Sequence, residues 1–222
     1  LNFNGSETFS VSVSDGEYED SQTITVTVNA VNDAPTADAA TGTTAEDQSV
    51  VISLSGSDID GDNLSFSLDS DATNGSVTLD GSLATYTPNT DFNGSDSFTF
   101  NVSDGEYSAS ASVDVSVTAV NDAPVLASVS DVSFDEDGSG STSLSGSDVD
   151  GDQLTFSITG GSDITATLDG SDVSFSAPAN YNGSETFSVS VSDGEYEDSQ
   201  TITVTVNPVN DAPIADAATG TT

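Results

Sequence analysis

Apolar and polar residues alternate strictly over several short segments of the chain. Phe9, Val11 and Val13 alternate with serines, and residues 24–28 alternate isoleucine or valine with threonine. A period of two with one apolar face predicts half-buried antiparallel β-strands. Both patterns recur later, at residues 98–102 and 113–117, and no stretch has helical periodicity. The pattern therefore predicts an all-β protein.

Turn signals separate these predicted strands at regular intervals. Asp-Gly or Asn-Gly pairs occur at Asp15-Gly16, Asn74-Gly75, Asp80-Gly81 and Asp169-Gly170. Such pairs favour tight turns between adjacent strands. Short strands at this spacing predict seven-strand β-sandwiches of immunoglobulin type.

Internal repeats define the organisation of the chain. Val-Asn-Asp-Ala-Pro recurs with a spacing of 89 residues, and Asn-Gly-Ser and Ser-Asp-Gly-Glu-Tyr recur in the same register. Residues 1–44 match residues 179–222 with four differences, so two kinds of domain alternate in a 178-residue unit. The predicted domains are a truncated repeat at 1–30, complete repeats at 31–119 and 120–208, and a linker with the next first strand at 209–222.

The truncated repeat raises a question of completion, because a lone strand pair cannot bury a core. One hypothesis is that residues 214–222, or more, of a neighbouring chain complete residues 1–30; the other is that residues 1–30 fray. A second detail concerns spacing: Asp58-Ile59-Asp60-Gly61-Asp62 and its counterpart at 148–152 are 90 residues apart. This offset predicts a one-residue insertion near residues 137–142.

Composition changes this picture through charge. The chain has 38 acidic residues and no lysine, arginine or histidine, which gives a formal net charge of −38. Nucleic acids and anionic membrane surfaces are excluded as electrostatic partners, since both require a cationic surface. The regular apolar alternation argues against disorder, so we expect a folded chain that recruits cations.

Other absences bear on stability and location. Cysteine is absent, so metal ions are the expected substitute for disulfides. No long apolar run is present to serve as a signal peptide or to insert directly into a membrane. Because methionine is also absent, we expect an internal segment of a longer protein, with any secretion signal outside it.

Alternating aspartates are the strongest chemical signal. In the segment Asp58-Ile59-Asp60-Gly61-Asp62, carboxylates alternate and glycine permits a sharp turn, so the oxygens can converge on one hard cation. Taken alone, such a segment fits an ordinary surface turn equally well. Its recurrence at 148–152, again after a Val-Asn-Asp-Ala-Pro linker, favours a metal site.

These motifs resemble those of bacterial cadherin-like tandem repeats found in large RTX-type adhesins and other surface proteins. Val-Asn-Asp-Ala-Pro is similar to the cadherin linker Asp-x-Asn-Asp-Asn-x-Pro, and Asp58-Ile59-Asp60 is similar to the cadherin Asp-x-Asp. Glu46, eleven residues after Pro35, lies where cadherins carry an early glutamate ligand. The cadherin Asp-Arg-Glu motif is absent and is replaced by Asn-Gly-Ser followed by Asp or Glu.

The resemblance implies that the tandem sandwiches are cadherin-like and form an extended array. It also implies calcium at each domain junction, with ligands from both neighbouring repeats of the same chain and from the linker. For the junction near residue 121 the implied ligands are Glu46, Asp96, Asn121, Asp122, Asp148, Asp150 and Asp193. For the junction near residue 32 they are Glu7, Asn32, Asp33, Asp58, Asp60 and Asp104. An open third site would use Glu136, Glu185, Asn210 and Asp211. Asp62 and Asp152 remain open between ligand and turn residue.

The sequence bears on three classes of function. An enzyme is disfavoured, because no His, Cys or Lys is available for a catalytic triad and the carboxylates recur once per domain. The leading prediction is a calcium-rigidified stalk or spacer of an adhesin or surface fibre, outside the cell. The alternatives are a module that binds carbohydrate or protein, and a subunit that assembles with like chains into a filament, biofilm or other matrix.

Overall fold

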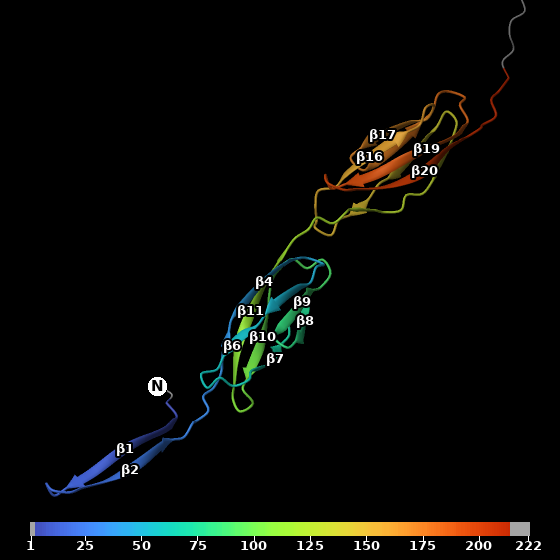
Figure 1. Cartoon of the computed structure of the whole chain (residues 1–222). Helices are drawn as coiled ribbons and strands as arrows, with labels where there is room; N and C mark the ends of the chain where they lie inside the picture. The colour runs from blue at the N-terminus through green and yellow to red at the C-terminus, as the bar shows by residue number, and fades with distance from the viewer. Residues whose placement is uncertain (1–2, 214–222) are drawn as a thin grey trace, which may run out of the picture. The chain divides into compact units, whose positions relative to one another are not determined.

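The described part of the chain is built from β-strands. In the computed structural model, which describes residues 3–213, every regular element is a strand (Figure 1). The chain divides between Val120 and Asn121 into two compact units. The first unit holds a hairpin and a sandwich, and the second holds another sandwich. The all-β prediction is confirmed.

A two-stranded hairpin precedes the first sandwich. Strands β1 (Gly5–Ser14) and β2 (Glu19–Val28) pair antiparallel in continuous register, from Gly5 opposite Val28 to Ser14 opposite Glu19. Asp15 closes the turn, since its Oδ1 accepts hydrogen bonds from the backbone N–H groups of Glu17 and Tyr18 at 2.9 and 2.8 Å. All residues of both strands are exposed, including the apolar ones.

The first sandwich packs a four-stranded sheet, in the order β4-β11-β10-β7, against a three-stranded sheet, in the order β5-β9-β8. A short pair, β3-β6, completes it. Single residues separate β3 from β4 and β5 from β6, so these pieces are interrupted strands of a seven-strand sandwich. The bounds are β3 (Thr36–Asp38), β4 (Ala40–Ala45), β5 (Val50–Ser53), β6 (Ser55–Ser57), β7 (Ser65–Ser70), β8 (Gly75–Asp80), β9 (Leu83–Pro88), β10 (Gly94–Ser103) and β11 (Ser108–Thr118).

The second sandwich repeats this arrangement. Its sheets are β13-β20-β19-β16 and β14-β18-β17, with the short pair β12-β15. The bounds are β12 (Val125–Leu126), β13 (Val132–Asp135), β14 (Ser139–Ser143), β15 (Gly146–Ser147), β16 (Thr155–Gly160), β17 (Thr165–Asp169), β18 (Asp172–Ser176), β19 (Gly183–Ser192) and β20 (Glu197–Asn207).

Each sandwich has its own apolar core, formed by the inward residues of the alternating segments. In the first core, Tyr86, Phe98 and Phe100 are at most 1% exposed. In the second core, the rings of Phe175 and Phe187 meet edge to face with centroids 5.3 Å apart. Burial of each large apolar side chain contributes about 1.5–3 kcal/mol to stability, so each core stabilises its own sandwich independently of charge.

Strand pairing relocates the predicted insertion. Thr36 pairs with Ser57 and Val125 with Ser147, so the first residues of the two sandwiches are still 89 apart. Gly42 pairs with Val115, whereas Val132 pairs with Val204, which places Val132 90 residues after Gly42. The extra residue therefore lies between Leu126 and Val132, and the prediction of residues 137–142 is wrong. The offset between distant motifs could not locate it, because the intervening segment carries no recognisable repeat.

Candidate metal centres

The aspartate-rich loop of the first sandwich is curled by its own first residue. Asp58 Oδ1 accepts hydrogen bonds from the backbone N–H groups of Asp60, Gly61 and Asp62 at 2.8, 3.1 and 3.4 Å. Gly61 has φ +82°, a left-handed conformation that favours glycine. The turn brings one carboxylate oxygen each from Asp58, Asp60 and Asp62 to within 4.8 Å of one another.

The linker that precedes the first sandwich is fixed to this loop and to a neighbouring turn. The backbone N–H of Asp33 donates to Asp60 Oδ2 at 2.8 Å, and Asn32 Nδ2 donates to Asp104 Oδ2 at 3.0 Å. We call this end, where the linker contacts the loop and the turn, the linker end of a sandwich. The linker end gathers five of the six residues that the resemblance assigned to the junction near residue 32, namely Asn32, Asp33, Asp58, Asp60 and Asp104. The sixth, Glu7, lies on the hairpin.

Asp104 is held as a carboxylate by its turn. Its Oδ1 accepts hydrogen bonds from the backbone N–H groups of Tyr107 and Glu106, both at 2.7 Å. The Tyr107 hydrogen bond is the main cause that lowers the pKa of Asp104; burial acts in the opposite direction, and the bonds from Glu106 and Asn32 add to the lowering. The charged form of Asp104 is therefore favoured.

The second sandwich reproduces the linker end. Asn121 Nδ2 donates to Asp193 Oδ2 at 2.9 Å, and the backbone N–H of Asp122 donates to Asp150 Oδ2 at 2.8 Å. Asp148 Oδ1 accepts from the N–H of Asp152 at 3.2 Å. Oxygens of Asp148, Asp150 and Asp152 again lie within 4.8 Å of one another. Asp62 and Asp152, which the sequence left open, thus belong to the clusters.

The pKa of Asp193 is also lowered, although burial raises it. The opposing hydrogen bonds come from the backbone N–H groups of Tyr196 and Glu195 and from the Asn121 side chain. The turn of Asp193 thus has the same chemistry as the turn of Asp104 in the first sandwich.

The opposite end of each sandwich, which we call the far end, carries a buried glutamate. Glu46 is 3% exposed; its backbone N–H donates to Thr118 O at 3.0 Å, and its Oε1 accepts a hydrogen bond from the N–H of Val120. Glu136 repeats this arrangement with Asn207 and Val209. Each glutamate is thereby anchored to the segment that leaves its sandwich.

The sequence reasoning did not identify Asp47 and Asp91, two aspartates at the far end of the first sandwich. Asp47 follows Glu46 with φ +57°, and its Oδ1 accepts from the N–H of Asp91, which also has φ +57°. In the second sandwich Asp137 accepts in the same way from Asn180. The recurrence of Glu-Asp at 46–47 and 136–137 is the sequence signal that could have identified Asp47.

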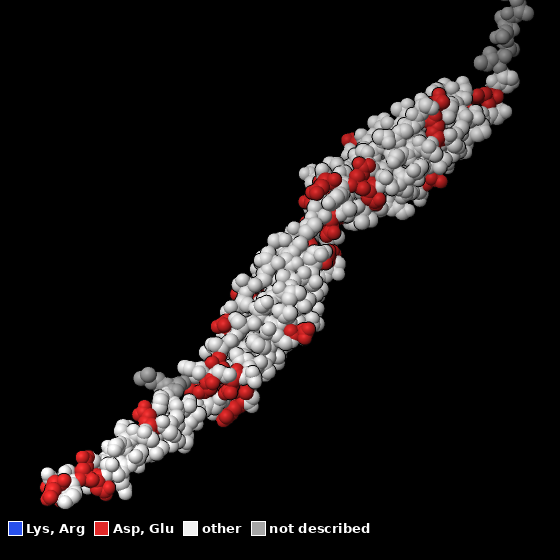
Figure 2. Space-filling model, in the orientation of Figure 1, with Lys and Arg blue, Asp and Glu red and all other residues white. Residues whose placement is uncertain are grey.

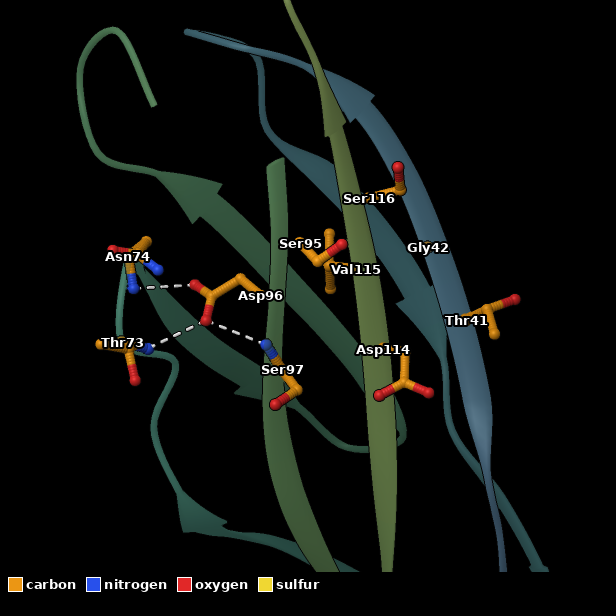
Figure 3. Close-up of a pocket in the computed structure, with 10 residues that line it drawn as sticks. All are labelled: Thr41, Gly42, Thr73, Asn74, Ser95, Asp96, Ser97, Asp114, Val115 and Ser116. Carbon is orange, nitrogen blue, oxygen red and sulfur yellow. Dashed lines mark hydrogen bonds between the residues drawn. The ribbon is translucent and has the colours of Figure 1, made fainter. Parts of the chain in front are cut away.

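Asp96 has a structural role that accounts for all its strong contacts (Figure 3). Oδ1 accepts hydrogen bonds from the N–H groups of Thr73 and Ser97 at 3.1 and 2.9 Å. Oδ2 accepts from the N–H of Asn74 at 2.8 Å and from the Tyr86 hydroxyl at 3.0 Å. Burial raises the pKa of Asp96, but these four hydrogen bonds outweigh it and the net shift is downward. Asp96 lies outside the carboxylate clusters, and its role as a ligand remains a prediction.

Glu185 fills the equivalent place in the second sandwich. Ser162 donates from its hydroxyl to Oε1 at 2.6 Å and from its N–H to Oε2 at 2.9 Å, and the N–H groups of Asp163 and Ile164 donate at 3.1 and 3.0 Å. The Ser162 hydroxyl is the largest cause that lowers the pKa of Glu185 to about 2. On the hairpin, the corresponding Glu7 is exposed opposite Val26.

The predicted third site is only partly described. Glu136 is placed at the far end of the second sandwich, and Asn210 Nδ2 donates to the carbonyl oxygen of Asp211 at 3.2 Å. Residues 214–222, which include the predicted first strand of the next repeat, lie outside the described residues. The ligand assignments at this site therefore remain predictions.

The clusters combine negative charge with unsatisfied oxygens. Two carboxylates 4.8 Å apart repel by about 1 kcal/mol in water and roughly 3 kcal/mol in a partly buried site. Figure 2 shows acidic groups gathered in patches and no basic residue to offset them. Among the described side chains, Glu46 Oε2, Asp58 Oδ2 and Asp148 Oδ2 are buried without a hydrogen-bond partner. Such oxygens are costly unless they are paired, so the clusters fit a hard divalent cation that prefers oxygen ligands.

The first sandwich carries a groove on its surface (Figure 3). It has a volume of about 670 Å³. Its lining residues are Thr41, Gly42, Thr73, Asn74, Ser95, Asp96, Ser97, Asp114, Val115 and Ser116. None of these is aromatic, and Asp96 already accepts four hydrogen bonds there. The groove therefore does not favour a carbohydrate site.

Comparison with known sequences gives a family match over most of the chain. The profile of the bacterial Ig domain family matches residues 32–118 and 121–206. Domains of this family are typical of surface or secreted proteins. No curated protein sequence is significantly similar to the chain.

Solved structures support the fold. The PcdhgB3 EC1-4 structure is 16% identical, covers 92% of this chain and 58% of its own, and has a TM-score of 0.61. Human protocadherin-24 EC1-2 is 16% identical, with coverage of 81% and 100% and a TM-score of 0.52. The endo-fucoidan hydrolase MfFcnA4 of glycoside hydrolase family 107 is 22% identical, with coverage of 94% and 34% and a TM-score of 0.35. The chain thus spans about a third of the hydrolase. The protocadherin likenesses confirm the prediction of tandem cadherin-like sandwiches.

Within residues 3–213, no helix has the length and apolar character needed to cross a membrane.

Proposed function

Because the chain belongs to the bacterial Ig domain family, we propose that it is a calcium-rigidified repeat array in the stalk or spacer of an extracellular surface protein, such as an adhesin. The observation that carries this proposal is the repetition of one carboxylate cluster, with its docked linker, in both sandwiches. A cluster that served only as a surface turn would not need an oxygen that is buried and unpaired, as Asp58 Oδ2 and Asp148 Oδ2 are.

The two ends of a sandwich have complementary chemistry for such an array. The linker end offers aspartate oxygens and a linker asparagine whose Nδ2 is held by Asp104 or Asp193. The far end offers Glu46, with one oxygen anchored to the backbone of Val120 and the other unpaired. We propose that calcium binds to the oxygens at both ends of each sandwich.

The protein residues have distinct parts in this proposal. When bound, calcium supplies a divalent positive charge that offsets the carboxylates and links them. Asp58 and Asp148 shape the loops through their backbone hydrogen bonds and present their second oxygens. The linker is already attached to the following sandwich through Asn32 or Asn121, so a cation has fewer freely rotating bonds to order.

We also propose that this segment has no catalytic role. Its titratable residues, Asp, Glu and Tyr, include no cationic or thiol group for a nucleophile-base pair. The clustered carboxylates recur once in each sandwich, as expected of repeated structural sites.

Calcium titration of the whole chain tests the proposal. We expect calcium to raise the free energy of unfolding by mass action, by about 2.7 kcal/mol at a free concentration one hundred times Kd, and so to raise the melting temperature. A chelator should reverse both changes. Small-angle scattering should show a more flexible chain with the chelator. Identical melting and scattering in calcium and chelator would contradict the proposal.

A single substitution sharpens this test. Glu46→Gln keeps an acceptor for the Val120 N–H but removes the buried charge. We expect it to weaken calcium binding about tenfold or more without lowering the melting temperature of the metal-free chain. Asp114→Asn, at an exposed position on β11, is the matched control and should leave calcium binding unchanged.

A further inference from the structure

The hairpin β1-β2 and the strand pair β19-β20 have the same sequence in two different environments. Residues 5–28 and 183–206 are identical, and the strand registers are equivalent. Phe9 and Ile24 are 52% and 50% exposed, whereas their counterparts Phe187 and Ile202 are each 1% exposed. The apolar face of the hairpin is therefore exposed, although the same face is buried under other strands in the second sandwich.

The second sandwich shows what that cover consists of. There β19-β20 lies between β16 and β13 in one sheet and faces the sheet β14-β18-β17. Phe187 packs against Phe175 of β18, and Gly161 leaves room for its ring, because a Cβ there would lie 2.5 Å from it. All these covering elements come from residues 125–178.

The half-buried carboxylate of Glu185 distinguishes this cover from that of the first sandwich. Glu185 accepts hydrogen bonds from the segment Ser162–Ile164. Its sandwich has Phe175 on β18, which has no hydroxyl that could donate a further hydrogen bond. In the first sandwich the shorter Asp96 takes this place and also accepts from the hydroxyl of Tyr86, the counterpart of Phe175. The hairpin carries the glutamate of the second sandwich, as Glu7.

The apolar side chains of the hairpin, like Glu7, match those of the second sandwich. Val11 and Ile24 repeat Val189 and Ile202 of the second sandwich, where the first sandwich has Phe100 and Val113. The larger Phe100 has a stacked partner in Phe66, 6.3 Å away. A cover shaped for Phe100 would leave a gap over Val11.

We infer that the exposed face of the hairpin is a docking surface for one occupant: a polypeptide segment with the sequence pattern of residues 125–178. Residues 214–222 do not fit this role, because they repeat residues 36–44, which begin the first kind of sandwich. Specificity would come from Glu7 and Val11, through the hydrogen-bonding segment and the cavity that each requires. The inference does not depend on calcium.

Two fusions of equal length test it. A copy of residues 120–178 placed before residue 1 restores the order found in the second sandwich, and a copy of residues 31–89 gives the first kind of cover. The chain has no cysteine, so Val11→Cys introduces a single reporter thiol. Val189→Cys, made separately, reports the fully covered state.

The expected result is a selective loss of thiol reactivity. In the chain without a fusion, Cys at position 11 should react with a thiol reagent at the rate of an exposed thiol. The 120–178 fusion should slow it by about a hundredfold or more, to within about tenfold of the Val189→Cys rate. The 31–89 fusion should slow it far less.

Three outcomes would overturn the inference. One is a reactive thiol in the 120–178 fusion while the thiol of Val189→Cys in the same fusion stays protected, which shows that the second sandwich is folded. Another is equal protection by both fusions. The third is concentration-dependent protection in the unfused chain, which would assign the surface to a second copy.

Discussion

Asp58, which directly follows β6, and Glu185, which lies in β19, use their carboxylates differently. One oxygen of Asp58 accepts hydrogen bonds from its own loop. The other is buried without a hydrogen-bond partner, beside two further carboxylates. Glu185 has both oxygens bonded to Ser162 and its neighbours. A carboxylate in the first situation gains from a cation, whereas one in the second is already stabilised by hydrogen bonds.

The low pKa of Glu185 has a consequence for acid stability. The pKa is about 2 in the folded protein against an ordinary value of 4.5, first because of the Ser162 hydroxyl. A folded-state pKa below the unfolded one adds stability above pH 4.5 that is lost as pH falls toward 2. We expect the second sandwich to lose stability in this window, and Glu185→Gln to lose less. Urea unfolding at several pH values with a chelator measures this.

The control for this acid experiment is Glu197→Gln, at an exposed position on β20. It should keep the acid dependence of the unsubstituted chain. A Glu185→Gln variant whose stability falls just as steeply between pH 4.5 and 2 would contradict the assignment.

Among the elements, identical strand pairs differ in what packs on them. β1 and β2 form the same ladder as β19 and β20, so hydrogen bonding within the pair does not distinguish them. The difference is the apolar cover, which is present over Phe187 and absent over Phe9. An isolated two-stranded hairpin is marginally stable in water, so the cover decides its stability.

Paired alanine substitutions measure the effect of this cover. Phe187→Ala should destabilise the second sandwich by about 3–5 kcal/mol, because it leaves a cavity beside Phe175. Phe9→Ala, in an identical local sequence, should change the stability of either sandwich by less than about 0.5 kcal/mol. Denaturant unfolding of both variants with a chelator gives the two values. Similar losses at the two positions would show that the hairpin is covered in solution.

At the scale of the whole molecule, charge is the dominant unfavourable feature. The net charge of −38 has no basic side chain to oppose it, and the two cores must offset the resulting repulsion. Bound divalent ions and dissolved salt both reduce this repulsion, but only ions held in the clusters also connect specific groups.

The salt dependence of stability follows from this charge. With a chelator present, we expect the melting temperature to rise by about 5 °C or more between about 10 mM and 500 mM NaCl, because screening weakens the repulsion. In saturating calcium the rise should be smaller, since the clusters are already neutralised. A metal-free melting temperature that stays constant or falls with salt would contradict the dominance of repulsion.

Sequence alone determined the all-β fold and the tandem arrangement of sandwiches, and the resemblance to cadherin-like repeats named most of the residues that meet at each linker end. These features depend on local patterns: alternation sets the inward face of a strand, and an Asp-rich loop with Gly61 curls by hydrogen bonds within five residues. The 89-residue repeat then places the same local patterns at the same end of each sandwich.

Only the tertiary structure decided how individual carboxylates are used. Asp96 finds its donors at Thr73, Asn74 and Tyr86, which are far from it in the sequence, and Glu46 meets Val120 across 74 residues. The place of the inserted residue also required the pairing of β13 with β20. The physical reason is that hydrogen-bond partners and strand registers are fixed by packing between distant segments, whereas strand periodicity and turn chemistry are written in adjacent residues.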